Sequence, residues 1–169
     1  MKKQITFVLV GIVILGIFAF VYGTKPAIPK VGAEGKINGN YTIEGIMRLG
    51  KPYVCTFEKS DGSSTLSGLV HTDGQKIYEE FKIKTDLVKN GFSSFLLIKD
   101  DVTYTWTSLQ KIGYKSAIVK SASQNASPQE QAQIVGTRDA ELYQCKPWLN
   151  VNSSIFETPT SITFSELKK

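Results

Sequence analysis

Residues 53–74, YVCTFEKSDGSSTLSGLVHTDG, hold two segments of alternating apolar pattern separated by an Asp-Gly pair. In the first segment Tyr53, Cys55 and Phe57 alternate with residues of the opposite face, and Val70 belongs to a similar pattern after the break. Successive side chains of a strand point to opposite faces, and Asp-Gly favours a tight hairpin because both central residues need a positive φ. The stretch therefore predicts two antiparallel strands joined by a short turn.

The same pattern continues on both sides of this hairpin. Short turns between strands favour an antiparallel meander, because parallel strands need a long crossover. The turns are expected at Asp73-Gly74, Asn90-Gly91 and Asp100-Asp101, and the further strands at residues 77–83, 92–99, 102–108, 111–120 and 161–164. Two short helices are predicted, one at residues 43–49 with Asn40 as its cap and one that begins after Ser127. The fold class is α+β and mainly antiparallel β, a curled meander sheet or half-barrel with an N-terminal helix and one further short helix.

Before the domain lies an apolar run at residues 5–23, which contains no charged residue and follows Lys2 and Lys3. As a helix it is about 28 Å long, close to the roughly 30 Å hydrocarbon thickness of a bilayer. It predicts a single N-terminal transmembrane helix, and an uncleaved anchor is favoured over a cleaved signal peptide because the run is long for a signal. We divide the chain into an anchor at residues 1–23, a Pro- and Gly-containing flexible spacer at 24–39 and an exported β-rich domain at 40–167.

The positive charge of the chain follows from this organisation. Lys and Arg total 20 against 15 Asp and Glu, but Lys2, Lys3, Lys25 and Lys30 flank the apolar run and every acidic residue lies at or after Glu34. The exported part is therefore close to neutral. A nucleic-acid surface needs a cluster of Lys and Arg, so nucleic acid is excluded as a partner.

Cys55 and Cys145 are the two cysteines of the chain, and both lie in the predicted exported domain. In an oxidising compartment such a pair predicts one disulfide. Two unpaired buried thiols and a metal site are the alternatives, and the second is weak because His71 is the only histidine.

Candidate chemistry is sparse. His71 and Asp73 lie in a predicted hairpin turn, which does not suit a nucleophilic triad, and Asp100-Asp101 lacks the ligand series of a calcium loop. Glu79 lies on the apolar face of its strand with Ile77. It is either a polar anchor for a ligand or, as we favour, a solvated or protective charge on an edge strand. We predict no catalytic residue, no metal and no cofactor.

The domain is rich in aromatic residues, and a single sheet with short helices has difficulty covering all of them. Ordinary core packing is the simpler interpretation. The functional interpretation is an apolar groove in the curled sheet that binds an acyl chain or another apolar molecule. Its lining residues would be Phe57, Ile77, Glu79, Phe81, Phe95, Tyr104, Trp106 and Trp148.

The order of these features resembles a known family. The chain resembles small exported bacterial proteins in its N-terminal helix, the meander entered by YVCTF at residues 53–57, the YTW strand at 104–106 and the closing CKPW at 145–148. These proteins in turn resemble the lipoprotein-carrier half-barrels, the family of periplasmic LolA. The resemblance implies a half-barrel around a hydrophobic cavity. The chain departs from it by its anchor, since a tethered carrier cannot travel.

From these observations we expect a single-pass protein of the cell membrane with an extracytoplasmic C-terminal domain. The domain would bind an apolar or lipid-like ligand without catalysing a reaction. The alternative is a structural or protein-interaction module of the cell envelope, which docks an envelope protein and has no small-molecule ligand.

Overall fold

The structure is a computed structural model that describes residues 27–60, 64–85, 88–118 and 140–167. Within these ranges nine strands form one sheet with the order β1-β8-β2-β3-β4-β5-β6-β7-β9. The strands are β1 (Ile37–Tyr41), β2 (Tyr53–Ser60), β3 (Ser64–Thr72), β4 (Ile77–Thr85), β5 (Val88–Lys99), β6 (Val102–Thr107), β7 (Ile112–Ala117), β8 (Glu141–Pro147) and β9 (Thr163–Glu166). The helical segments are η1 (Ala33–Gly35), α2 (Ile43–Met47) and η2 (Ser153–Phe156).

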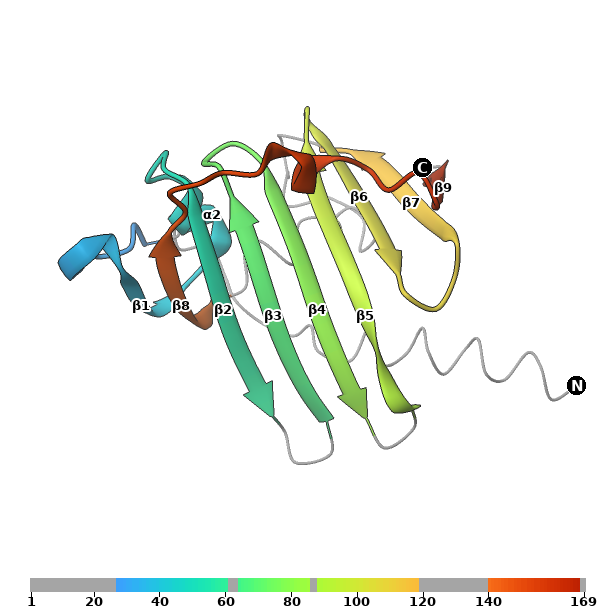
Figure 1. The fold of residues 1–169 in the computed structure, drawn as a ribbon, viewed down its shortest axis with the longest axis horizontal. Coiled ribbons are helices and arrows are strands. Elements are labelled where there is room, and N and C mark those ends of the chain that lie inside the picture. The colour runs from blue at the N-terminus through green and yellow to red at the C-terminus, as the bar shows by residue number, and fades with distance from the viewer. Residues whose placement is uncertain (1–26, 61–63, 86–87, 119–139, 168–169) are drawn as a thin grey trace, which may run out of the picture.

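Strands β2 to β7 form the predicted antiparallel meander, in which each strand pairs with the next one along the chain. Strand β8 then pairs with β2, at the edge of the meander opposite to β7, and β1 pairs with β8. The last strand, β9, runs parallel to β7, which the prediction of an antiparallel meander did not include. The result is an open curled sheet that is mostly antiparallel, with β1 and β9 as its edges (Figure 1).

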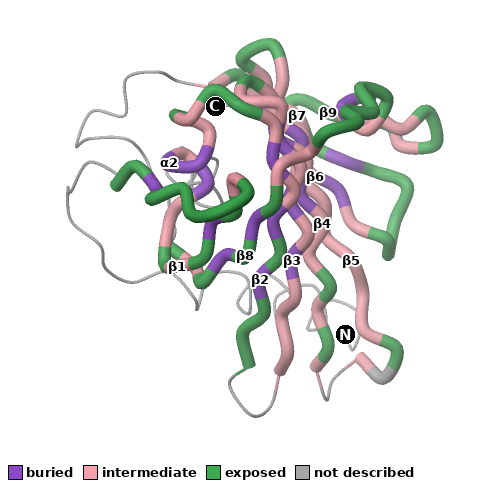
Figure 2. Tube along the Cα trace, turned by 60° about the vertical axis from the view of Figure 1, so that its left-hand side comes forward, coloured by how far each residue is buried: buried purple, intermediate pink, exposed green. Residues whose placement is uncertain are grey.

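The two faces of the sheet have different covers. The first, which we call the helix face, carries Cys55, Val70 and Ile77, and these pack in one buried cluster with Ile43 and Ile46 of α2. In Figure 2, α2 and β1 lie to one side of the long strands, and burial is greatest in the halves of the strands near them.

The second face, the C-terminal face, is crossed by residues 148–162 on their way from β8 to β9, as the red segment in Figure 1 shows. Leu97 and Trp106 of the sheet form a buried cluster with Phe156 of this segment. The core is therefore divided by the sheet into two parts.

Helix α2 lies where the sequence predicts a helix, but its N-cap residue differs from the predicted one. The Thr42 side chain, and not that of Asn40, accepts a hydrogen bond from the Gly45 N–H at 3.0 Å. Asn40 instead belongs to β1. Gly50 adopts a φ of 62° after the helix, as expected for a residue that ends a helix.

The predicted spacer is too long, because β1 begins at Ile37. That side chain is fully buried and lies opposite Cys145. Backbone pairing with β8 and the burial of Ile37 order residues that the Pro and Gly content assigned to a flexible segment.

The Asn90-Gly91 pair is not a hairpin turn. It lies inside β5, where Gly91 has a φ of 62° and the pairing of β4 with β5 shifts register between Ile83 and Thr85. A glycine with positive φ suits such an irregularity as well as a turn. By contrast, Asp100 and Asp101 both have positive φ and join β5 to β6 as predicted.

Three predictions lie outside the described residues: the transmembrane helix at residues 5–23, the turn at Asp61-Gly62 and the helix after Ser127. Among the residues that the structure describes, no helix is long and apolar enough to cross a membrane.

Candidate functional site

The sheet separates the predicted ligand-binding residues into two groups. Phe57, Ile77, Glu79 and Phe81 belong to or pack against the cluster of the helix face, whereas Phe95, Tyr104, Trp106 and Trp148 belong to that of the C-terminal face. Neighbouring residues of a strand point to opposite faces, so the eight side chains cannot line one groove.

On the C-terminal face the aromatic side chains pack on one another. Phe95 stacks on Trp106 with ring centroids 5.2 Å apart, and the Trp106 ring meets Phe164 edge-on at 5.8 Å. The ring centroids of Trp148 and Phe156 are 6.0 Å apart. These contacts fill this part of the face with the protein's own side chains. This half of the predicted set is therefore core.

The helix face contains the predicted disulfide. Cys55 of β2 and Cys145 of β8 are opposite each other in the register and are joined by an S–S bond. Both are buried, and the described residues contain no free cysteine. The prediction of one disulfide is confirmed, and the alternatives of free thiols or a metal site are wrong.

Glu79 lies in the same row of the helix face. Through the register the row runs from Cys55 to Val70, Glu79 and Leu96. The preferred interpretation of Glu79 as an edge-strand charge is wrong, because β4 lies between β3 and β5 near the middle of the sheet and Glu79 is 1% exposed.

Among the described residues, the carboxyl group of Glu79 has no hydrogen-bond partner at either oxygen. Burial raises its pKa from 4.5 to about 8, because a charged carboxylate loses its hydration in apolar surroundings. Glu79 is therefore mainly protonated at neutral pH. Buried polar groups almost always have a partner, so an unpartnered carboxyl in a core calls for an explanation.

The surroundings of Glu79 are apolar. Val70 and Leu96 lie opposite it on the neighbouring strands, and Ile77 and Phe81 are its same-face neighbours along β4. The arrangement presents one polar group in an apolar surface, as a binding site for an apolar molecule with one polar group would require.

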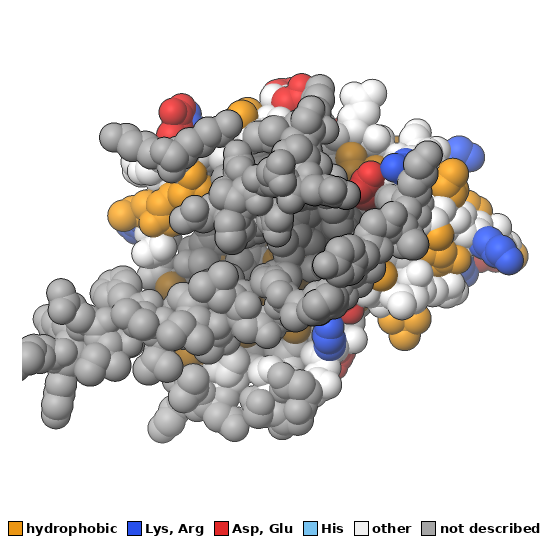
Figure 3. Space-filling model, turned by 180° about the vertical axis from the view of Figure 1, so that it is seen from behind, with side chains coloured by type: hydrophobic (Ala, Val, Ile, Leu, Met, Phe, Trp, Pro, Cys, Tyr) orange, Lys and Arg blue, Asp and Glu red, His pale blue; other side chains and the backbone are white. Residues whose placement is uncertain are grey.

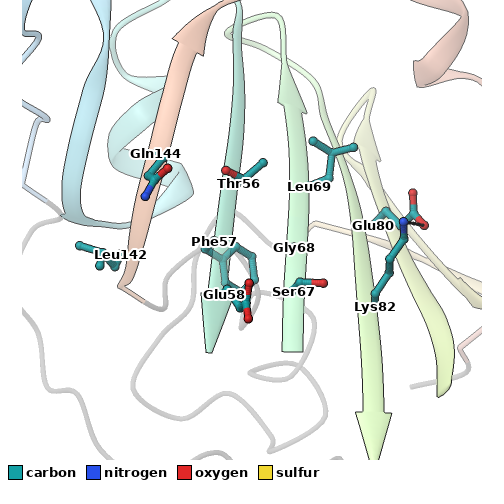
Figure 4. A pocket seen from close by; sticks show the side chains of 10 residues that line it. All are labelled: Thr56, Phe57, Glu58, Ser67, Gly68, Leu69, Glu80, Lys82, Leu142 and Gln144. Atoms are coloured by element: carbon teal, nitrogen blue, oxygen red, sulfur yellow. Dashed lines mark ion pairs between the residues drawn. The ribbon is translucent and has the colours of Figure 1, made fainter. Parts of the chain in front are cut away.

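The C-terminal face carries an open hollow of about 450 Å³ in the exposed halves of the strands. Figure 4 shows the mixed character of its lining, with Glu80 and Lys82 close together; the Glu80 Oε1 to Lys82 Nζ distance is 3.9 Å. The lining residues are Thr56, Phe57, Glu58, Ser67, Gly68, Leu69, Glu80, Lys82, Leu142 and Gln144. The sequence did not indicate this hollow, because alternating polar residues are also typical of an ordinary solvent-facing surface.

His71 lies on the C-terminal face, where its ring meets Trp148 edge-on at a centroid distance of 4.9 Å. Its Nδ1 is buried without a hydrogen-bond partner among the described residues, and burial lowers the pKa of the imidazole from 6.5. Asp73 accepts hydrogen bonds from the N–H groups of Gln75 and Lys76 through Oδ1. Asp73 thus lies in the turn between β3 and β4, as predicted, whereas His71 belongs to β3 and not to the turn.

No metal-binding group of three or more His, Cys, Asp or Glu residues is found in the described part of the chain. Lys and Arg side chains are scattered in the space-filling view from behind (Figure 3). Comparison with known protein families, with curated proteins and with solved structures finds no match to this chain.

Proposed function

We propose that this chain is a membrane-anchored extracytoplasmic binding module that holds an apolar, lipid-like ligand on the helix face without catalysing a reaction. The observation that carries the proposal is Glu79, a carboxyl group that is 1% exposed and unpartnered in the middle of an apolar sheet face. An unpaired buried polar group costs stability, by about 1–3 kcal/mol. A ligand that pairs with it offsets that cost.

Binding fits this face better than catalysis does. A general acid and base pair requires two titratable groups within reach of one substrate. The register places Val70 and Leu96 beside Glu79, and Glu80 points to the opposite face. The apolar neighbours suit an alkyl chain, while a single carboxyl suits orientation of its polar end.

The buried Cys55–Cys145 disulfide supports a location outside the reducing cytosol. The apolar run at residues 5–23 supports attachment to the membrane. A tethered module receives its ligand from the adjacent bilayer or a partner and does not carry it away. The relationship to the lipoprotein-carrier half-barrels stays a prediction.

Photolabelling tests the proposal directly. The full-length chain in phospholipid nanodiscs is exposed to an alkyl diazirine probe and irradiated, and the labelled residues are mapped by peptide mass spectrometry. We expect labelling at Val70 and Leu96 of the helix face that an excess of unlabelled alkyl competitor suppresses. Their neighbours Leu69 and Leu97, on the other face, are the matched controls.

Labelling that is absent from the helix face would remove the ligand-binding proposal and favour the envelope-interaction module. One observation favours this second candidate. Leu149 and Val151, in the segment that crosses the C-terminal face, are 87% and 41% exposed. In that case chemical cross-linking from this segment to an envelope protein, lost in Leu149→Asp, is the expected result.

A further inference from the structure

We propose that the ligand of the helix face carries a basic nitrogen, and that its ammonium group pairs with the Glu79 carboxylate. The inference rests on the proposed function and names the chemical class of the ligand. It starts from the geometry of one unpartnered buried acid on this face.

The charge on the helix face favours a cation over an anion. Between Leu66 and Thr105, the described side chains that the register places on this face include no Lys, Arg or His, and Glu79 is the ionisable group among them. The register gives them as Leu66, Gly68, Val70, Thr72, Ile77, Glu79, Phe81, Ile83, Phe92, Ser94, Leu96, Ile98, Thr103 and Thr105. A fatty-acid carboxylate would find no counter-charge here, and ionised Glu79 would repel it.

The other elements of the helix face contribute tyrosine side chains. Among the described residues, Tyr53 and Tyr143 belong to the same buried cluster, Tyr41 packs against it and Tyr114 lies at the far edge of the row.

Among the described residues, charged groups at the margin of this face form ion pairs. In α2, Arg48 Nη2 lies 3.1 Å from Glu44 Oε1, and at the ends of β2 and β8, Lys59 Nζ lies 3.4 Å from Glu141 Oε1. Glu79 differs from these described groups because it is buried, and burial raises its pKa to about 8.

Hydrogen bonding also fits an ammonium group. A carboxylate only accepts hydrogen bonds and an ammonium group only donates them, so the two orphaned oxygens can both be satisfied. Hydrogen bonds between charged partners are roughly twice as strong as those between neutral ones. Because Glu79 is 1% exposed, such a pair is shielded from water and from salt screening.

The proton balance of this step is defined. At neutral pH Glu79 is protonated, because burial raises its pKa to about 8. Binding of R–NH₃⁺ leaves a carboxylate paired with the ammonium, and one proton passes to solvent. Apparent affinity for an amine therefore rises with pH, by up to about tenfold per unit, until the pKa of Glu79 is reached. A neutral alcohol shows no such rise, and a carboxylate ligand binds more weakly as pH increases.

The test compares octylamine, 1-octanol and octanoate binding to the full-length chain in phospholipid nanodiscs. Isothermal titration at pH 6 and pH 9, with empty nanodiscs as the blank, gives the affinities. Alkyl amines, like Lys, stay charged to about pH 10. We expect octylamine to bind more tightly at pH 9 than at pH 6, and Glu79→Gln to abolish that difference. Glu80→Gln, on the same strand but the opposite face, should keep it.

The outcomes separate the two proposals. The amine inference is overturned if 1-octanol binds but the affinity for octylamine does not rise with pH, or rises equally in Glu79→Gln. The binding function stands in that case. Preference for octanoate also overturns it. If none of the three binds, the proposed function itself fails.

A further measurement needs no variant, in case Glu79→Gln does not fold. Titrations of the unaltered chain at pH 6.5 in two buffers of different ionisation enthalpy count the protons released. About one proton per octylamine supports the inference, because the pKa of Glu79 lies well above this pH. Release of none overturns it.

Discussion

At Glu79 a titratable group occupies a position that packing alone would give to an aliphatic residue. Its carboxyl lies between Val70 and Leu96 and is unpartnered, so the folded chain favours the protonated form. Between pH 4.5 and pH 8 the folded state keeps a proton that the unfolded state has lost. The free energy of unfolding therefore decreases as pH rises through this window and is level above it.

Glu79→Gln should remove this pH dependence. We expect the variant to be more stable than the unaltered chain at pH 9, where the unaltered chain holds a buried carboxylate, and the advantage to shrink by up to about 1.4 kcal/mol per pH unit as pH falls to 5.5. Urea unfolding followed by the fluorescence of Trp106 and Trp148 measures the difference. An advantage that does not change with pH would show that Glu79 is not buried as a neutral acid.

His71 does not disturb this comparison. Burial lowers its pKa, so its contribution to stability is complete above pH 6.5 and is lost as pH falls through the lowered value. The contribution is the same in both chains and cancels in their difference.

The sequence identified Glu79 as unusual, because strand alternation places it with Ile77 and Phe81. It could not show that β4 is central, since an edge strand and a central strand can have the same alternation. Nor could it divide the aromatic residues between faces, because the phase of one strand's alternation is not related to that of another until the register is known.

At the scale of the elements, β2 and β3 are complementary in shape at one position. Phe57 lies opposite Gly68, and a Cβ at Gly68 would overlap the Phe57 ring. The ring also meets Phe81 and Tyr143 edge-on, at 6.0 and 5.4 Å. The absence of a side chain at Gly68 thus allows one aromatic residue to cover two strands.

Gly68→Ala should destabilise the domain by about 1–3 kcal/mol, since the added methyl group displaces a ring in a packed cluster. Phe57→Leu also destabilises it, but the double variant should lose less than the sum of the two, because the smaller side chain makes room. Urea midpoints test this, with Ser67→Ala on the opposite face as the near-neutral control. Simple additivity would mean that the two residues do not share this contact.

The segment between β8 and β9 stabilises the C-terminal face through Phe156. This side chain is 2% exposed and packs with Leu97 and Trp106. Phe156→Ala should cost about 3–5 kcal/mol, the usual range for a buried phenylalanine. Leu149→Ala, seven positions earlier and 87% exposed, should change stability by less than about 0.5 kcal/mol. Thermal or urea unfolding of both variants checks the contrast, and equal effects would contradict the assigned packing.

Element prediction succeeded where alternation and turn residues agreed. Asp100-Asp101 lies at a real turn, with both residues at positive φ, whereas Asn90-Gly91 lies inside β5. A glycine-containing pair reports only that the backbone needs positive φ, and a strand irregularity meets that need as well as a hairpin does. The cap residue Thr42 was missed for a similar reason, because Asn40 is an equally good cap by type.

For the whole molecule, the meander was predictable and its edges were not. Each strand from β2 to β7 pairs with its neighbour in sequence, which local patterns can indicate. The insertion of β8 between β1 and β2, and the parallel pairing of β9 with β7, join residues far apart in the chain. Such pairings depend on which apolar faces complement each other in three dimensions. The alternation of a single strand does not predict which strand it pairs with.

The Cys55–Cys145 bond spans 90 positions and ties β8 to the first strand of the meander. Closing a loop of this length stabilises the fold by about 4–5 kcal/mol in the chain-entropy model, because it restricts the unfolded chain. Cys55→Ala and Cys145→Ala should each lose about this amount, and the double variant should lose little more, since either change alone removes the bond. Alanine is the better substitution here, because serine would add a buried hydroxyl group at positions that are 0% and 4% exposed. Urea unfolding without reductant measures the three variants. Losses that add in the double variant would mean that each cysteine acts through separate packing contacts and that the bond does not stabilise the sheet.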